Sequence, residues 1–237
     1  MKIIFRLDDI QGFYLNKTQI EIIDAFLKHS SGPCPINLGL IGYNFIDDSW
    51  LSNEVIKRTK EYSEFIEIAC HTWSHKPLIM LSKEEQIDDI KEFKNKIQPL
   101  FKQEIITLIA PENYFNEDTY EAMFKNDLSI LSSVFTVELP FQKFDLGNYP
   151  ISIPANILGS HYPNPEFRSP EILLDEILQL KSENAEQEII TVVLHPSDFF
   201  NGNQIEISRI KDLSNLIQSC KDNNLELTKF SDFKGIT

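Results

Sequence analysis

The sequence at residues 66–75 reads IEIACHTWSH, an alternating apolar stretch that runs directly into two histidines. Alternate residues of a strand point to opposite faces, so Glu67 and His71 share one face, which we expect to point inward. A buried glutamate is costly unless it is paired, and this pattern favours a polar site over a plain core. His71 and His75 lie four residues apart and can reach one metal ion, since neutral imidazoles bind zinc and similar metals. The alternative is one satisfied core histidine and one surface histidine.

Two further apolar stretches end in residues that bind metals or exchange protons. Residues 3–9 read IIFRLDD and residues 189–196 read IITVVLHP. Asp8 and Asp9 are adjacent, so a regular pleat would separate their side chains, and they converge only if the strand ends and turns there. A polar turn with helix-capping aspartates is the alternative. His195 alone is compatible with a structural role, but three strands that end in such residues favour a common site.

Apolar segments alternate with longer amphipathic segments, which is typical of a βαβ architecture. Strands are expected at residues 2–7, 35–41, 65–70, 104–110, 129–135, 155–160, 188–194 and 225–229. Helices are expected at about residues 18–29, 50–62, 82–102, 117–126, 169–183 and 206–223. The segment from Pro140 to Pro170 is expected to hold a pair of short strands and an active-site loop. The pattern predicts an α/β fold, an irregular (β/α)7-type barrel with catalytic residues at the strand C-termini.

Composition limits the classes of function. The 237 residues suit a single domain spanning 1–237, with no Pro/Gly/Ser-rich linker. Three widely spaced cysteines indicate reduced thiols. A net charge of −14 argues against a nucleic acid partner, although the acidity also serves solubility. No apolar run approaches the roughly 20 residues of a membrane span. Only Lys2 precedes an apolar run that Arg6 and Asp8 interrupt, so we expect no secretory signal and a cytoplasmic location.

In this order the motifs resemble those of the polysaccharide deacetylase (NodB-homology) family of metal-dependent amide hydrolases. Residues 5–9 are similar to its first motif, an apolar run that ends in Asp-Asp. Residues 67–75 are similar to its second motif, Glu-Ile-Gly-x-His-Ser/Thr-x-x-His, with alanine in place of glycine. Residues 194–196, LHP, are similar to its last motif. Residues 108–114, LIAPENY, stand where the family usually has Phe-Arg-x-Pro, and Ile109 replaces the arginine.

The resemblance implies a polysaccharide-deacetylase-like catalytic domain and a role for each matched residue. Asp9, His71 and His75 would bind one divalent metal ion, with zinc expected first and Fe, Co, Ni or Mn as alternatives. Asp8 would be the general base that deprotonates the attacking water. His195 would be the general acid that protonates the leaving amine.

The implied reaction is hydrolysis of an N-acyl group, most simply N-acetyl, from a carbohydrate or related small amide. One alternative is a non-catalytic carbohydrate-binding or regulatory protein on the same fold. The absence of the third-motif arginine would then be a sign that catalysis has been lost. A metal phosphoesterase is a third reading, which the acidic charge disfavours. For a cytoplasmic protein, a small amino-sugar conjugate suits the chemistry better than a cell-wall polymer.

Two residues to which the resemblance gives no role, Arg6 and His161, could also lie near the site. Arg6 lies two residues before Asp8 and therefore on the same strand face. It either supplies the positive charge missing at Ile109, pairs with Glu67, or places its guanidinium group in solvent. His161 falls in the irregular region and is expected to be a loop residue rather than a ligand.

Overall fold

The computed structural model describes residues 1–12, 16–133, 151–160, 167–183, 189–201 and 204–234. The strands are β1 Lys2–Ile10, β2 Ile36–Leu40, β3 Ile66–Cys70, β4 Thr107–Ile109, β5 Ile130–Ser133, β6 Ile151–Pro154, β7 Ile157–Leu158, β8 Ile189–Leu194, β9 Phe200–Asn201, β10 Gln204–Ile205 and β11 Glu226–Thr228. The α-helices are α1 Asn16–Leu27, α2 Gly42–Asp47, α3 Ser49–Glu61, α4 Lys83–Phe101, α5 Glu117–Lys125, α6 Pro170–Glu183 and α7 Ile207–Asp222. Four short 3-10 helices are η1 Leu78–Met80, η2 Pro111–Asn113, η3 Pro196–Phe199 and η4 Phe230–Phe233.

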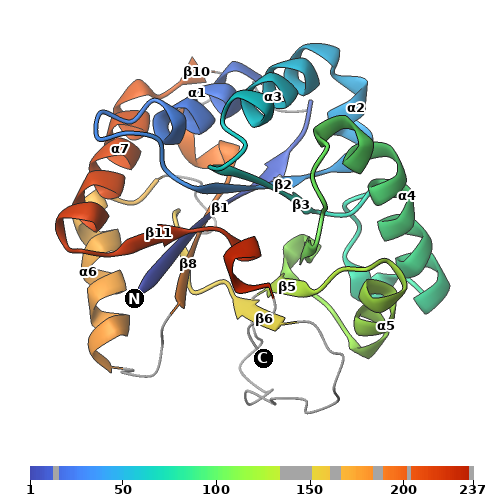
Figure 1. The fold of residues 1–237 in the computed structure, drawn as a ribbon. Helices are drawn as coiled ribbons and strands as arrows, with labels where there is room; N and C mark the ends of the chain where they lie inside the picture. Colours follow the sequence, from blue (N-terminus) through green and yellow to red (C-terminus); the bar gives the residue numbers. More distant parts are fainter. Residues whose placement is uncertain (13–15, 134–150, 161–166, 184–188, 202–203, 235–237) are drawn as a thin grey trace.

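Within these residues nine of the strands form one strongly curled parallel sheet, and the α-helices cover its outside (Figure 1). The other two, β9 and β10, form a separate antiparallel pair. The strand order is β6-β5-β4-β3-β2-β1-β8-β7, and β11 pairs with the first residues of β1. The two outermost strands of this order, β6 and β7, are consecutive in the chain, since only Ala155 and Asn156 separate them. Ala155 N donates to Ser133 O on one side, and Asn156 N donates to Thr191 O on the other. This single segment therefore bridges β5 and β8, as an irregular barrel requires.

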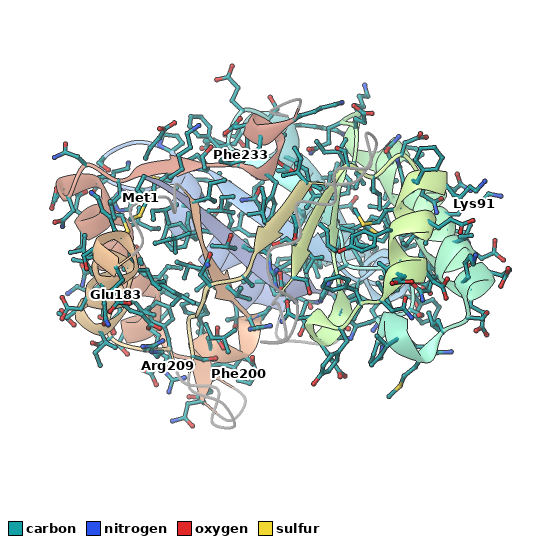
Figure 2. The ribbon with its side chains drawn as sticks, turned by 90° about the horizontal axis from the view of Figure 1, so that it is seen from below. Met1, Lys91, Glu183, Phe200, Arg209 and Phe233 are labelled. Atoms are coloured by element: carbon teal, nitrogen blue, oxygen red, sulfur yellow. The ribbon has the colours of Figure 1, made fainter. Side chains whose placement is uncertain are left out.

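The N-terminal end of the barrel is filled, which leaves the opposite end for chemistry. Apolar side chains of β1, β5 and β6, together with Ile106 just before β4, pack inside it against Phe230 and Phe233 of η4. The amides that begin η4 are held from the barrel wall, because Phe230 N donates to Asn37 Oδ1 (3.1 Å) and Ser231 N donates to Glu67 Oε2 (2.7 Å). Figure 2 shows Phe233 at one end of the strands and Phe200, which follows β8, at the other.

The predicted α/β barrel is confirmed, and each of the six predicted helices appears within a few residues of its expected bounds. Ser82 caps α4 as its capping-box pattern predicts, with Glu85 reaching back to the amide of Ser82. Helix α2 was not predicted, because it has six residues and its N-cap, Ile41, makes no side-chain cap bond. None of the described helices is long and apolar enough to cross a membrane.

Two expectations need comment. The strand predicted at residues 2–7 is too short, because β1 continues to Ile10. In the segment from Pro140 to Pro170, the pair of short strands is present as β6 and β7. The expected active-site loop and His161 lie outside the described residues.

Candidate metal centre

The two aspartates of the first motif lie on a bulge inside β1. The register of β1 against β2 shifts between Leu7 and Ile10, and Asp9 has a φ of +58°. A non-glycine residue seldom adopts this left-handed conformation, which short polar side chains tolerate best. A bulge adds one residue to a strand and re-aims the side chains beside it. The chain therefore turns at Asp9 without ending the strand, and Asp8 and Asp9 both lie at the same end of the barrel.

Three potential metal ligands converge where β1 and β3 end. Asp9 Oδ1 lies 3.1 Å from His71 Nε2 and 3.0 Å from His75 Nε2, and the two Nε2 atoms are 3.2 Å apart. Ligands about 2.0–2.2 Å from one ion, at angles of about 90–110°, are themselves about 2.8–3.6 Å apart. The three atoms thus have the mutual spacing of neighbouring ligands on a single ion. His71, His75 and Asp9 form the one group of potential metal ligands found among the described residues.

Hydrogen bonding sets the tautomer of His71. Its Nδ1 lies 2.9 Å from Ile109 O, and because a carbonyl only accepts, this nitrogen carries the proton. In the neutral ring Nε2 is therefore unprotonated and can bind a metal ion, whereas in the protonated ring Nε2 donates to Asp9 Oδ1. Such support of the distal ring nitrogen is usual for metal-bound histidines. Ile109, which occupies the place of the third-motif arginine, thus contributes through its backbone.

The electrostatics favour a positive charge at the point where these side chains meet. Burial alone would raise the pKa of Asp9, but hydrogen bonds to His71 and His75 outweigh it and hold this pKa well below its usual range. Burial alone would lower the pKa of His71, but the hydrogen bond with Asp9 and the charges of Asp8 and Asp9 raise it. A proton on His71 stabilises the metal-free group, and a divalent cation supplies the same sign of charge. The residues therefore fit a metal ion.

Arg6 and Asp8 form a buried ion pair inside the barrel. Arg6 is 0% exposed, and its Nη2 donates to Asp8 Oδ2 at 2.7 Å. The same guanidinium donates to Ser132 Oγ (2.9 Å), Ser132 O (3.2 Å) and Asn113 Oδ1 (3.1 Å). Of the three expectations for Arg6, the geometry matches the one that places its charge beside Asp8. A guanidinium group exposed to solvent is excluded, because Arg6 is fully buried.

Glu67 points into the barrel, as strand parity predicts, but it serves another purpose. Its Oε1 accepts from Thr107 Oγ1 (2.8 Å) and its Oε2 accepts from Ser231 N (2.7 Å). Burial raises the pKa of Glu67, although these hydrogen bonds by themselves would lower it. The carboxyl therefore secures η4 at the N-terminal end of the barrel. Neither pairing with Arg6 nor a place among the metal ligands is observed.

One oxygen of Asp8 is held and the other is free to act. Oδ2 accepts from Arg6, whereas Oδ1 is buried and has no hydrogen-bond donor among the described residues. Gly39 leaves space beside it, because a Cβ at that position would lie 3.2 Å from Oδ1. Buried polar oxygens ordinarily have a partner, so Oδ1 is suited to accept from a water or a substrate group.

His195 follows β8 and is held by Asp198 of η3. His195 N donates to Asp198 Oδ2 (2.8 Å), and His195 Nδ1 lies 4.0 Å from the same oxygen. Asp198 is 1% exposed, and its own carbonyl accepts from Phe167 N and from Arg209 Nη1. Burial raises the pKa of Asp198, while the charge of His195 opposes that rise. Leu194 pairs with Leu7 in the register of β8 against β1, so His195 lies at the same end of the barrel as Asp8 and Asp9.

Four residues of this arrangement were not predicted from sequence: Gly39, Asn113, Ser132 and Asp198. Asp198 carried a usable signal, since an aspartate three residues after His195 can accept from the histidine's amide in a tight turn. Ser132 and Asn113 carried none, because they reach Arg6 across sequence separations of 126 and 107 residues.

Comparisons with known proteins agree with this fold. Residues 40–130 match the family model described as polysaccharide deacetylase. A putative polysaccharide deacetylase from Mycobacterium smegmatis has a TM-score of 0.70 at 11% identity, over 98% of this chain and 88% of that one. A family 4 acetyl xylan esterase from Clostridium thermocellum, solved with a cobalt ion, has a TM-score of 0.65 at 11% identity, over 100% and 91% of the two chains.

A family CE4 pseudoenzyme from Bacillus anthracis is also similar, with a TM-score of 0.63 at 14% identity, over 98% of this chain and 64% of that one. This chain thus spans less than two thirds of that relative's length. None of the curated proteins matches the sequence. At these identities the solved structures establish the fold, the distorted parallel barrel, and the family model shows a similarity to polysaccharide deacetylases over residues 40–130.

Proposed function

We propose that residues 1–237 form one catalytic domain of the polysaccharide deacetylase family, which hydrolyses an N-acyl group, most simply N-acetyl, on a carbohydrate or related small amide. The observation that carries this proposal is the convergence of Asp9, His71 and His75 on one point at the C-terminal end of the barrel. The family match over residues 40–130 supports it, since this range includes both histidines.

In the proposed reaction a divalent ion, with zinc as the first candidate, is held by Asp9, His71 and His75, where it would polarise the acyl carbonyl and acidify a bound water. Asp8 accepts the proton of the attacking water at Oδ1, the oxygen that Arg6 leaves free. The Arg6 guanidinium fixes the orientation of Asp8 through Oδ2.

The proposed general acid is His195, which protonates the departing nitrogen. It follows β8, whose Leu194 pairs with Leu7 of β1, so it lies at the end of the barrel that holds Asp8 and Asp9. Its side chain is half-buried, so it remains accessible to a substrate. The hydrogen bond from His195 N to Asp198 fixes the backbone from which the ring projects.

A binding or regulatory protein on the same fold is the second candidate. Two observations favour it: the third motif supplies no cation at Ile109, and one similar fold is a pseudoenzyme. The buried pair of Arg6 and Asp8 weighs against it, because a guanidinium is present beside the proposed base from a different strand. We therefore favour catalysis.

The proposed substrate follows from charge. With a net charge of −14, the protein would repel a strongly anionic polymer, and a small neutral or cationic amino-sugar conjugate is the better candidate.

The test is release of acetate from N-acetylated amino sugars by protein loaded with zinc or cobalt. Native protein should release acetate, and the Asp8→Asn variant, with its metal ligands intact, should not. Metal-loaded native protein that binds these sugars without releasing acetate would favour the non-catalytic candidate.

A further inference from the structure

The loop that carries His75 has an unusual backbone. Of the four residues 72–75, Thr72 has a φ of +63° and His75 a φ of +58°. Neither is glycine, so both occupy a region that L residues seldom adopt. Such conformations persist only when surrounding contacts hold them. The position of His75 therefore depends on what holds this loop.

Asp89 of α4 accepts from two consecutive amides of the loop. Its Oδ2 lies 2.8 Å from Trp73 N, and its Oδ1 lies 3.2 Å from Ser74 N. Successive backbone amides that point the same way form a concave site for an anion, and a charged acceptor strengthens such hydrogen bonds. Here the anion is a side chain of the protein itself.

The other contacts of the loop use different atoms. Gly42 N donates to Thr72 O (3.0 Å), and Tyr43 N donates to Trp73 O (3.1 Å). His75 N donates to Thr72 Oγ1 (3.0 Å). These bonds hold the loop's carbonyls and its last amide, whereas Asp89 holds the two amides in its middle.

Helix α4 offers a fixed base for this contact. Its N-terminus is closed by the capping box of Ser82 and Glu85. Ile90 and Phe93, one and four residues beyond Asp89, are fully buried in the core. Asp89 thus connects the loop to a helix that is anchored on the sheet.

We propose that Asp89 is a positioning residue of the metal centre, which holds the loop so that His75 Nε2 meets His71 Nε2 and Asp9 Oδ1. This inference rests on the proposed metal site. His71 needs no such support, because β3 and Ile109 O already place it. Asp89 touches no ligand atom and acts through the backbone of the loop.

The test compares Asp89→Ala and Asp89→Asn with a matched control, Asp88→Ala, which removes the same charge from an exposed neighbouring position. Two quantities are measured: the affinity for Zn²⁺ by titration, and the exchange rates of the Trp73 and Ser74 amides in metal-free protein. We expect Asp89→Ala to weaken Zn²⁺ binding about 10- to 100-fold, as loss of a supporting contact typically does, and to accelerate both amides. Asp89→Asn retains one acceptor oxygen and should fall between Asp89→Ala and native protein.

Unchanged Zn²⁺ affinity in folded Asp89→Ala overturns the proposal, even if its melting temperature falls. Unchanged amide exchange in that variant overturns it as well. If Asp89→Ala does not fold, Asp89→Asn decides, and an affinity equal to that of Asp88→Asn counts against the proposal. Native protein that binds no Zn²⁺ instead contradicts the proposed metal centre, and amide exchange still shows whether Asp89 holds the loop.

Discussion

Replacing Arg6 with methionine tests the link between the buried ion pair and catalysis. Methionine keeps an unbranched apolar stem but removes four hydrogen bonds, those to Asp8, Asn113 and Ser132. It leaves a carboxylate that is 2% exposed without its cation. Removing one partner of a buried pair costs about 3–5 kcal/mol. At about 2–4 °C per kcal/mol for a chain of this size, the melting temperature should fall by roughly 6–20 °C.

The kinetic consequences of Arg6→Met separate a positioning role from a structural one. Asp8 loses the group that fixes its orientation, so turnover should fall about a hundredfold. The carboxylate also loses the cation that favours its charged form, so the acidic limb of the pH–rate profile should move to higher pH. Bound metal should be retained, because Arg6 contacts none of Asp9, His71 and His75.

The assay is a pH–rate profile of acetate release, with metal content and melting temperature measured on the same samples. Arg58→Met is the matched control, since Arg58 also pairs with carboxylates, Asp24 and Glu54, but lies away from the site. It should lower stability and leave the acidic limb in place. Arg6→Met with reduced stability but an unmoved acidic limb would refute the proposed role of Arg6.

Three further predictions address single residues. Asp8→Asn preserves size and should lower turnover about a hundredfold or more with metal still bound, and near-normal turnover would remove Asp8 as the base. Gly39→Ala adds a Cβ 3.2 Å from Asp8 Oδ1 and 3.1 Å from Ile109 Cδ1, so it should lower turnover more than metal content; equal losses of both would contradict this. Burial raises the pKa of Asp198, so folded protein holds this proton more tightly than the unfolded chain, and the resulting stability is lost as pH rises from about 3.9 through the folded value. Asp198→Asn cannot ionise, so its melting temperature should fall less than that of native protein as pH rises above about 4, and parallel curves would contradict a raised pKa of Asp198.

The sequence predicts the barrel well because the barrel depends on local patterns. Apolar strands separated by amphipathic helices and a capping box at Ser82 are signals that each segment carries by itself. The segment that bridges β5 and β8 was harder to predict, because β6 and β7 are short and an isolated strand of two residues has no recognisable sequence pattern.

The clustering of Asp9, His71 and His75 was predictable from the sequence, but the residues that hold them in place were not. Asp9, His71 and His75 stand out because few other residue types bind metals, and strand ends bring them to one place. The bulge at Asp9 was not predictable, since nothing in Leu-Asp-Asp-Ile requires a left-handed residue. The contacts of Arg6 with Ser132 join residues far apart in sequence, and only the closed barrel brings them together.

The central claim is that Asp9, His71 and His75 bind one divalent ion. The most direct measurement is the metal content of purified native protein and of His71→Ala, by elemental analysis after equilibration with Zn²⁺, with circular dichroism to show that the variant is folded. We expect about one ion per native chain and close to none in folded His71→Ala. Equal metal content in the two proteins would contradict it.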